Sequence, residues 1–266
     1  MNDRIATDVA PFVRREVDPR GVVTLTLDRP QSFNALSEGM LAALQAELDA
    51  VAADESARVV VIAATGKAFC AGHDLKEMRA EPSLAYYERL FTQCARMMMT
   101  IQRLPVPVIA RVQGIATAAG CQLVAACDLA VAADSARFAV SGVNLGLFCS
   151  SPSVPLVRNV ARKPAFEMLV TGEFISADEA RARGLVNRVA SMEALDGAVE
   201  SLVAAIVAKP RSAIALGKAL FYRQIERGSE AAYEDAARTM AGNMMEADTL
   251  EGVQAFIDKR KPDWQR

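Results

Sequence analysis

The spacing of apolar residues predicts several strands in the first two thirds of the chain. Residues 22–27 (VVTLTL) alternate and are rich in β-branched side chains, which indicates a strand. Residues 59–64 (VVVIAA) and 107–112 (PVIARV) are continuous apolar runs of strand length, typical of parallel strands that are buried on both faces. Shorter strands are predicted around residues 129–140.

Helical patterns separate these strands. From Ser37 onward apolar residues recur at helical spacing, and Ser37 itself is a suitable N-cap. Residues 83–103 and 117–127 also have helical patterns. Because strands alternate with helices, the fold class is predicted to be α/β with layers of helix and sheet.

The last third of the chain is predicted to be almost entirely helical, since strand signals fade from about residue 153. Ser176 and Glu179 form a capping box, and Gly184 ends that helix. Further helices are predicted over residues 191–208, 210–227, 230–246 and 249–260. No linker precedes this region, so we expect it to pack on the α/β part and to offer apolar faces to another subunit.

Composition excludes several classes of partner. At 266 residues, 52% hydrophobic and 23% charged, the chain can bury one large α/β core or two small ones. The net charge of −2, with basic residues spread along the chain, argues against nucleic acid. No apolar run approaches the roughly 20 residues of a membrane span, and residues 1–16 lack the features of a signal or transit peptide.

The cysteines contribute a prediction about the compartment. There are five, an odd number, with no C-x-x-C spacing, so neither a disulfide framework nor a zinc site is expected. They fit buried small residues in a reducing cytoplasm. We therefore expect a cytoplasmic protein without membrane association.

The sequence lacks the motifs of several common ligand-binding and catalytic sites. Residues 114–120 do not have the dinucleotide spacing G-x-G-x-x-G, residues 66–67 do not belong to a phosphate loop, and no G-x-S-x-G is present. His73 and Glu77 have a spacing that could hold a metal, but no third ligand accompanies them. A solvated or capping role is the better interpretation of that pair, and no metal is expected.

Two short segments share one design. FCAGHDL (69–75) and ATAAGCQL (116–123) each follow a buried strand, and each has small residues where the backbone turns. Backbone N–H groups from two such turns can bind one oxygen from two sides, as in an oxyanion hole, and a helix that starts near Ala119 adds partial positive charge. Composition alone favours a simpler reading, in which alanine and glycine merely allow tight packing of helix on sheet.

Motifs along nearly the whole chain, in order and at matching spacing, together resemble the enoyl-CoA hydratase/isomerase (crotonase) family. They comprise residues 30, 34–36, 67–75, 114, 120–122, 127–128, 144–146, 171–173, 175–177, 180 and 184–186. The ending KRKPDW (259–264) is also similar to the C-terminal helix of that family. Each motif by itself is weak evidence for this family, whereas the combination of all of them is specific to it.

This resemblance implies a crotonase-like ββα spiral followed by a C-terminal helical trimerisation region. We assign residues 1–200 to the spiral core and residues 201–266 to the helical oligomerisation region. A homotrimer or a dimer of trimers is expected. The implied ligand is an acyl-CoA thioester, so that coenzyme A is part of the substrate and no separate cofactor is expected.

The resemblance also assigns site residues. The backbone N–H groups of His73 and Ala119 would polarise the thioester carbonyl and stabilise an enolate, while the imidazole of His73 is either incidental or a participant. The substrate-binding residues would be Ala71, His73, Asp74, Leu75, Lys76 and Ala119, together with Phe256 and Lys259 reaching the ligand of a neighbouring subunit. Lys259 is suited to a phosphate group.

The sequence departs from the family at both catalytic glutamates. Alignment with the family places Gln122 at the first position and Gly142 at the second. Neither residue transfers protons near neutral pH, and each such group is typically worth about 10²–10⁴ in rate. Hydration is therefore expected to be weak or absent, and Gln122 is expected at most to orient a water or a substrate.

Other polar or nucleophilic residues follow Gly142, the second expected glutamate position. The polar or nucleophilic candidates are Gly142 itself, Asn144, Cys149, Ser150 and Ser151, although a loop with capping serines before a helix at Pro152 explains them equally well. The leading hypothesis is an enzyme of the lyase or isomerase class that stabilises acyl-CoA enolates. The alternatives are a non-catalytic acyl-CoA binder or regulatory subunit and, more weakly, a dinucleotide-dependent oxidoreductase.

Overall fold

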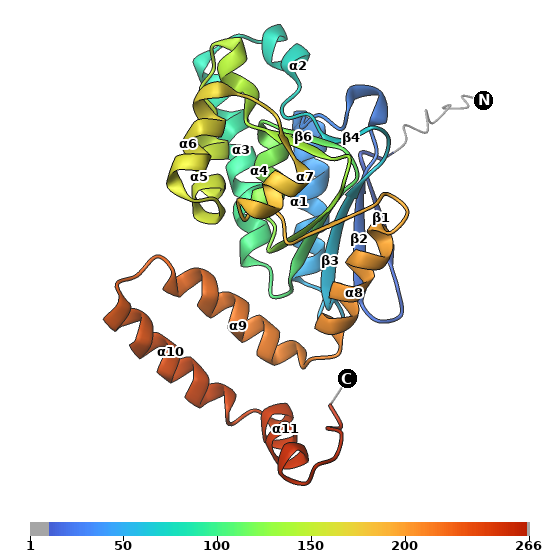
Figure 1. Cartoon of the computed structure of the whole chain (residues 1–266), viewed down its shortest axis with the longest axis vertical. Helices are drawn as coiled ribbons and strands as arrows, with labels where there is room; N and C mark the ends of the chain where they lie inside the picture. The colour runs from blue at the N-terminus through green and yellow to red at the C-terminus, as the bar shows by residue number, and fades with distance from the viewer. Residues whose placement is uncertain (1–10, 265–266) are drawn as a thin grey trace, which may run out of the picture.

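The computed structural model describes residues 11–264, which form two sheets and a set of covering helices (Figure 1). The strands are β1 (Val13–Val17), β2 (Val22–Leu27), β3 (Val59–Ala64), β4 (Ala68–Cys70), β5 (Val108–Val112), β6 (Ile115–Thr117), β7 (Leu129–Ala133), β8 (Arg137–Ala139), β9 (Ile175–Ser176) and β10 (Arg188–Ala190). The helices are α1 (Glu38–Ala52), α2 (Leu75–Ala80), α3 (Leu84–Arg103), α4 (Ala119–Ala126), α5 (Ser150–Asn159), α6 (Arg162–Thr171), α7 (Ala177–Ala182), α8 (Leu195–Val207), α9 (Arg211–Gln224), α10 (Ser229–Asn243) and α11 (Ala247–Ile257). Short 3₁₀ helices cover Pro30–Ser32 and Ser141–Leu145.

Strand order shows how the chain winds. The large sheet has the order β1-β2-β3-β5-β7-β10, in which only β1 is antiparallel to its neighbour, and the small sheet has the order β4-β6-β8-β9. Each turn places one strand in the large sheet and the next in the small sheet, as in β3–β4, β5–β6 and β7–β8. Helices follow the first two of these pairs, which confirms the predicted ββα spiral.

The strongest sequence patterns form the core. Ser37 caps α1 by accepting a hydrogen bond from the Met40 N–H at 3.1 Å, and the apolar stripe of that helix is fully buried. Every residue of β3 is buried, as expected for a parallel strand covered on both faces. Buried Asn34 donates from Nδ2 to the carbonyl oxygens of Thr65 and Ala68, and so holds the start of β4 in place.

The expectation that strands end near residue 153 is wrong, because β9 and β10 complete the two sheets. Both are only two or three residues long, and so are too short to show a period in the sequence. Within residues 11–264 no helix combines the length and hydropathy that crossing a bilayer requires. The expectation about a leader in residues 1–16 falls mostly outside the described residues.

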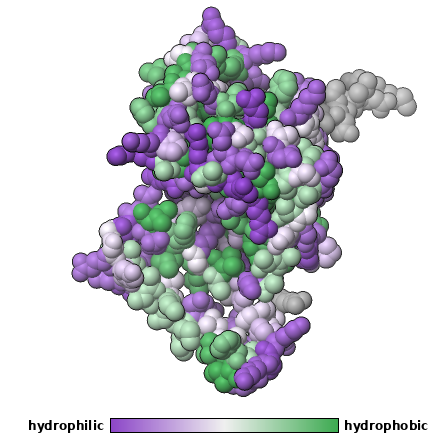
Figure 2. Space-filling view, in the orientation of Figure 1, coloured by the Kyte–Doolittle hydropathy of each residue, from purple (hydrophilic) through white to green (hydrophobic). Residues whose placement is uncertain are grey.

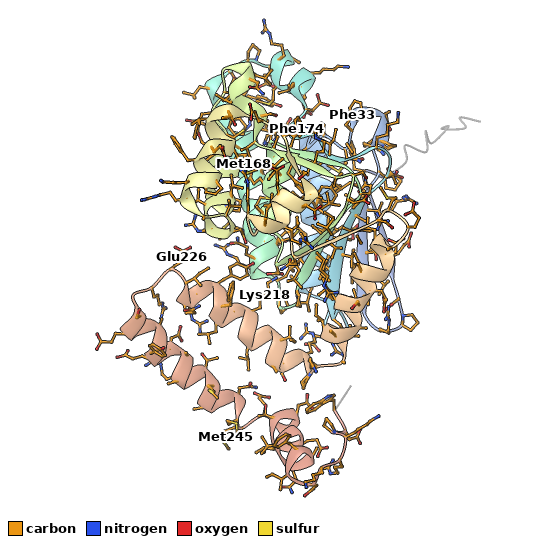
Figure 3. All side chains as sticks on the ribbon, in the orientation of Figure 1. Phe33, Met168, Phe174, Lys218, Glu226 and Met245 are labelled. Atoms are coloured by element: carbon orange, nitrogen blue, oxygen red, sulfur yellow. The ribbon has the colours of Figure 1, made fainter. Side chains whose placement is uncertain are left out.

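Helices α9 to α11 form an arm that extends from the α/β layers (Figure 1). Lys218, labelled on α9 in Figure 3, reaches back to the core: its Nζ donates to Asp128 Oδ2 and, at 2.9 Å each, to the carbonyl oxygens of Ile101 and Val106. Tyr222 donates its hydroxyl to Asp128 Oδ1 at 2.7 Å. Burial lowers the pKa of Lys218, and the Asp128 carboxylate opposes this shift.

The arm begins near the predicted division of the chain at residue 200. That position lies inside α8, which packs on the large sheet, so the helices that stand apart from the sheet start with α9. The division into 1–200 and 201–266 stays a prediction.

Candidate active site

The two small-residue segments meet beside the small sheet. Strands β4 and β6 pair in parallel with Cys70 opposite Ala116, so the turns that follow them lie side by side. Gly72 has a φ of +94°, and a Cβ atom built on it would lie 3.2 Å from the Thr117 carbonyl oxygen and 3.4 Å from the Ala119 nitrogen. The backbone preceding His73 therefore lies directly against the start of α4.

Glycine makes this approach feasible. A Cβ atom on Gly120 would overlap the Cys70 carbonyl oxygen and lie 2.7 Å from its carbon. Gly114 is packed in the same way against the carbonyl of Lys67. The tight-packing reading of these glycines is thus confirmed, and the packing is also what brings the two turns together.

The start of α4 presents an unpaired donor. Ala118, the residue before the helix, has φ +49° and ψ −120°, a conformation rare for a residue with a side chain and typical of functional turns. Its own N–H donates to the Ala139 carbonyl oxygen at 3.0 Å. Ala119 is the first helical residue, and within residues 11–264 neither its N–H nor that of His73 donates to any acceptor. Two unpaired backbone donors thus lie on adjacent turns, and one of them is at a helix N-terminus, a position that favours anions.

The His73 side chain points back into the protein. Its Nδ1 lies 3.2 Å from the Leu36 carbonyl oxygen, and its ring packs edge-on against Phe91 with centroids 5.4 Å apart. Burial lowers the pKa of the imidazole, and the hydrogen bond to Leu36 opposes that shift. The ring is therefore neutral near pH 7, with Nδ1 as the donor to Leu36.

Some neighbours of His73 are already engaged in hydrogen bonds, whereas the side chains of others are exposed. Asp74 caps α2, since its Oδ1 accepts from the N–H groups of Lys76 at 2.9 Å and Glu77 at 3.2 Å. Ala71 is half-buried and donates its N–H to Phe33, whereas the Leu75 and Lys76 side chains are exposed. The pair formed by His73 and Glu77 is not joined into a metal site, because Glu77 accepts from the Glu38 N–H at 2.9 Å, and no metal-ligand cluster occurs in the described part of the chain.

Gln122 and Gly142, at the two expected glutamate positions, have different surroundings. The Gln122 side chain is buried, and its Oε1 has no hydrogen-bond partner. Gly142 is packed against its own loop: a Cβ atom there would lie 2.7 Å from Cys149 Sγ and would overlap the Leu147 carbonyl oxygen. No side chain of any kind fits at residue 142 without rearrangement of that loop.

The polar candidates after residue 142 mostly support the loop. Asn144 donates from Nδ2 to the Gly172 carbonyl oxygen at 3.3 Å, and Cys149 Sγ accepts from the Gly142 N–H at 3.2 Å. Burial raises the pKa of the Cys149 thiol, which disfavours the nucleophilic thiolate. Ser150 begins α5, and its hydroxyl lies 3.4 Å from the Phe148 carbonyl oxygen.

Phe256 and Lys259 lie away from these groups. Both are exposed at the end of the arm, on or just after α11, and Figure 1 places α11 at the opposite end of the molecule from α2. The structure of one chain does not bring them to the candidate site. A role at a ligand would require a second copy of the chain.

One hydroxyl pair at the site was not predicted. Thr117 Oγ1 and Ser141 Oγ lie 2.8 Å apart and join the end of β6 to the 3₁₀ helix that contains Gly142. Thr117 lies in the ATAAGCQL segment, but nothing in the sequence pairs it with Ser141. Their contact follows from the pairing of β6 with β8, parallel strands whose carboxyl ends meet at one edge of the sheet.

The fold and the site define a class of protein, a ββα spiral in which the turns after β4 and β6 pack against each other at the start of α4. The chain belongs to the enoyl-CoA hydratase/isomerase family, whose sequence profile matches residues 18–266. A crystal structure titled as an enoyl-CoA hydratase of Mycobacterium smegmatis is 67% identical, with a TM-score of 0.96 over 97% of this chain and all of that one. The human enoyl-CoA hydratase domain-containing protein 3 structure is 43% identical, with a TM-score of 0.92 over 95% of this chain and all of that one.

The names of several relatives contradict the expected cellular compartment. Enoyl-CoA hydratase domain-containing protein 3 of Xenopus laevis is 48% identical over 92% of this chain and 83% of that relative, and it is named mitochondrial, as are its rat, mouse and human counterparts. The cytoplasmic location predicted from the sequence is therefore wrong. Unpaired cysteines indicate a compartment that is not oxidising, which is a broader class than the cytoplasm.

Proposed function

We propose that the protein binds acyl-CoA thioesters and stabilises their enolate form through the backbone N–H groups of His73 and Ala119. The observation that carries this proposal is the pair of unpaired donors, brought together by Gly72 and Gly120 at the N-terminus of α4. Donors held in place before reaction stabilise the negative charge that develops on the thioester oxygen. The similarity to an enoyl-CoA hydratase and to an enoyl-CoA hydratase domain-containing protein supports a thioester ligand.

Hydration is not part of the proposed activity. Residue 122 carries an amide and residue 142 carries no side chain, so neither expected proton-transfer group is present. A non-catalytic acyl-CoA binder, or a regulatory subunit of a mixed oligomer, is the second candidate function. The raised pKa of the Cys149 thiol and the use of the Asn144 amide to hold the Gly172 carbonyl oxygen favour it, because neither side chain is then placed as a nucleophile.

Replacement of Ala119 with proline tests the proposed oxyanion hole. Proline is tolerated as the first residue of a helix, and it would remove the N–H without removing any intrahelical hydrogen bond. We expect exchange of the C2 protons of butyryl-CoA in deuterated water, followed by mass spectrometry, to fall about 100-fold. Binding of butyryl-CoA, measured by calorimetry, is expected to weaken as well.

Leu84→Pro is the matched control, because Leu84 is the first residue of α3 and its side chain is 74% exposed. It should leave exchange and binding unchanged. Unaltered exchange in a folded Ala119→Pro variant would contradict the role of this donor. Binding without any exchange in the wild-type protein would favour the non-catalytic binder.

We also propose that the chain assembles as a homotrimer or a dimer of trimers through the arm. Apolar residues lie at the surface of the arm (Figure 2), where an isolated chain exposes Phe221, Tyr233, Met240, Met245, Phe256 and Ile257. So many large apolar side chains on one segment are typical of an interface between subunits. In such an assembly Phe256 and Lys259 would reach the site of a neighbouring copy, with Lys259 near a phosphate of coenzyme A.

Sedimentation velocity is expected to give three or six chain masses for the wild-type protein. Met240, 71% exposed in the single chain, should be replaceable by lysine without loss of fold but with dissociation of the assembly. Val17→Lys, at a residue 52% exposed on the edge strand β1, makes the same change elsewhere and should leave the mass unchanged. A monomeric wild-type protein would refute this assembly.

A further inference from the structure

A groove on the outer face of the large sheet contains none of the candidate active-site residues. It lies between α8 and the outer faces of β1, β2 and β3, elements that Figure 1 shows next to one another. Its volume is about 530 Å³, within the range of small-molecule sites. We call it the outer groove and define its floor by Thr24, Thr26, Val61 and Ala63.

Small side chains on the floor create the outer groove. Thr24 pairs with Val61 and Thr26 with Ala63 across β2 and β3. Successive side chains of a strand point to opposite faces, so Leu25, between the two threonines, faces the core while the threonines face the groove. Within the described residues neither threonine hydroxyl forms a hydrogen bond, so both side chains are available to a ligand.

One charged cluster at the outer groove is already neutralised within the protein. Arg20, in the turn between β1 and β2, donates from Nε to Asp18 Oδ2 at 2.8 Å and from Nη2 to Glu200 Oε2 of α8 at 3.0 Å. This bridge joins the turn to the helix and closes that end of the groove. Because two carboxylates share the Arg20 guanidinium, it offers no free positive charge to a ligand.

Arg111 and Glu16, by contrast, keep groups free for a ligand. The Arg111 side chain on β5 is 22% exposed; its Nε donates to Asp196, and within the described residues neither Nη atom has a partner. Such a pair of nitrogens can hold a carboxylate in a bidentate manner. Glu16 on β1 is exposed and is also unpaired in that part of the chain. Because β1 and β5 are three strand spacings apart, about 14 Å, both long side chains can reach over the floor.

The charges of the outer groove favour a zwitterion. Its lining includes four carboxylates and two guanidinium groups, which gives a formal charge of −2. A simple anion bound to Arg111 would be repelled by this excess of negative charge, and a simple cation would leave the Nη groups of Arg111 without a partner. A ligand with one carboxylate and one ammonium group satisfies both Arg111 and Glu16.

We propose that the outer groove binds a free aliphatic α-amino acid, with its carboxylate on the Nη groups of Arg111, its ammonium group toward Glu16 and its side chain on the floor. The methyl groups of Thr24, Val61 and Ala63 supply the apolar contacts. This site is separate from the proposed thioester site, and the inference does not depend on the proposed function.

Three compounds with matching carbon skeletons test the ligand class: L-leucine, 4-methylpentanoate, which lacks the ammonium group, and 3-methylbutylamine, which lacks the carboxylate. In saturation-transfer NMR titrations of the wild-type protein, leucine is expected to bind about tenfold more tightly than either analogue, the typical contribution of a charge-assisted hydrogen bond. Equal binding of leucine and either analogue, or no binding of leucine, would overturn the proposal.

Two variants locate the amino-acid site. Arg111→Gln should weaken leucine binding about tenfold, whereas Glu16→Gln, at an exposed residue, should weaken it about threefold. The control is Arg14→Gln, because Arg14 pairs through Nε with Asp28 at 3.0 Å, as Arg111 does with Asp196, but does not line the outer groove. It should bind leucine as tightly as the wild type. Unchanged leucine binding in either Arg111→Gln or Glu16→Gln would contradict the assignment.

Butyryl-CoA separates this inference from the proposed function. A saturating concentration of butyryl-CoA should leave the affinity for leucine unchanged, because the two sites share no residue. Displacement of leucine by butyryl-CoA would place the amino acid at the candidate active site and overturn the inference. Failure of butyryl-CoA to bind, with leucine still bound, would refute the proposed function and leave the outer groove as an amino-acid site.

Discussion

Crotonyl-CoA is expected to be hydrated by this protein about 10⁴-fold or more slowly than by a relative that carries both glutamates, since each absent group is typically worth about 10²–10⁴. Water addition needs a base for the water and an acid for the α-carbon. The amide of Gln122 supplies neither, and the backbone at Gly142 is covered by its own loop. The two unpaired donors still favour binding of the thioester, so the loss should appear in kcat.

Loss of the enoyl absorbance measures this rate, with a glutamate-bearing hydratase assayed in parallel. Gln122→Glu alone is expected to recover only a small part of the difference. Gly142→Glu should not restore activity in either background, because a Cβ atom at that position would lie 2.7 Å from Cys149 Sγ and overlap the Leu147 carbonyl oxygen. Turnover close to that of the comparison hydratase would show that residues 122 and 142 do not occupy the glutamate positions.

Replacement of Gly120 with alanine is expected to lower the free energy of unfolding by about 3 kcal/mol, the upper end of the usual cost of overpacking, and to abolish thioester binding. The added Cβ atom would overlap the carbonyl oxygen of Cys70, and both groups belong to backbone in regular structure, on α4 and β4. The helix must move off the strand, which separates the Ala119 N–H from the His73 N–H. Denaturant titration and calorimetry with butyryl-CoA measure the two effects.

Gly197→Ala provides the matched control, since Gly197 lies within α8 and a Cβ atom on it meets no atom within 4 Å. Alanine is favoured over glycine in a helix by about 1 kcal/mol, so this variant should be slightly more stable than the wild type. A Gly120→Ala protein with unchanged stability and binding would refute the close packing of α4 against β4.

The fold was predictable where the hydrophobic pattern is long. The apolar stripe of α1 and the continuous runs of β3 and β5 each specify an element and its buried face. Strands β4 and β6 were not predicted as strands, because three residues are too few to show alternation. Their pairing depends on contacts between segments about 45 residues apart, which no local pattern records.

The site was predictable in its residues and not in its geometry. Sequence motifs indicated His73 and Ala119, but the strained turn at Ala118 and the contact of Gly72 with residue 119 are tertiary features. The hydroxyl pair of Thr117 and Ser141 has no sequence signature. The filled space at Gly142 was also unforeseen, since an empty glutamate position in an alignment does not reveal that a cysteine sulfur lies against it.

The contact between Lys218 and Asp128 ties the arm to the site through a single short helix. Asp128 follows the C-cap of α4, whose first residue is Ala119, so the two ends of this helix are about 12 Å apart. A movement of α9 relative to the core must either separate a buried lysine from its carboxylate or carry the C-terminal end of α4 with it. The position of α9 and the position of the Ala119 N–H are therefore linked through about two turns of helix.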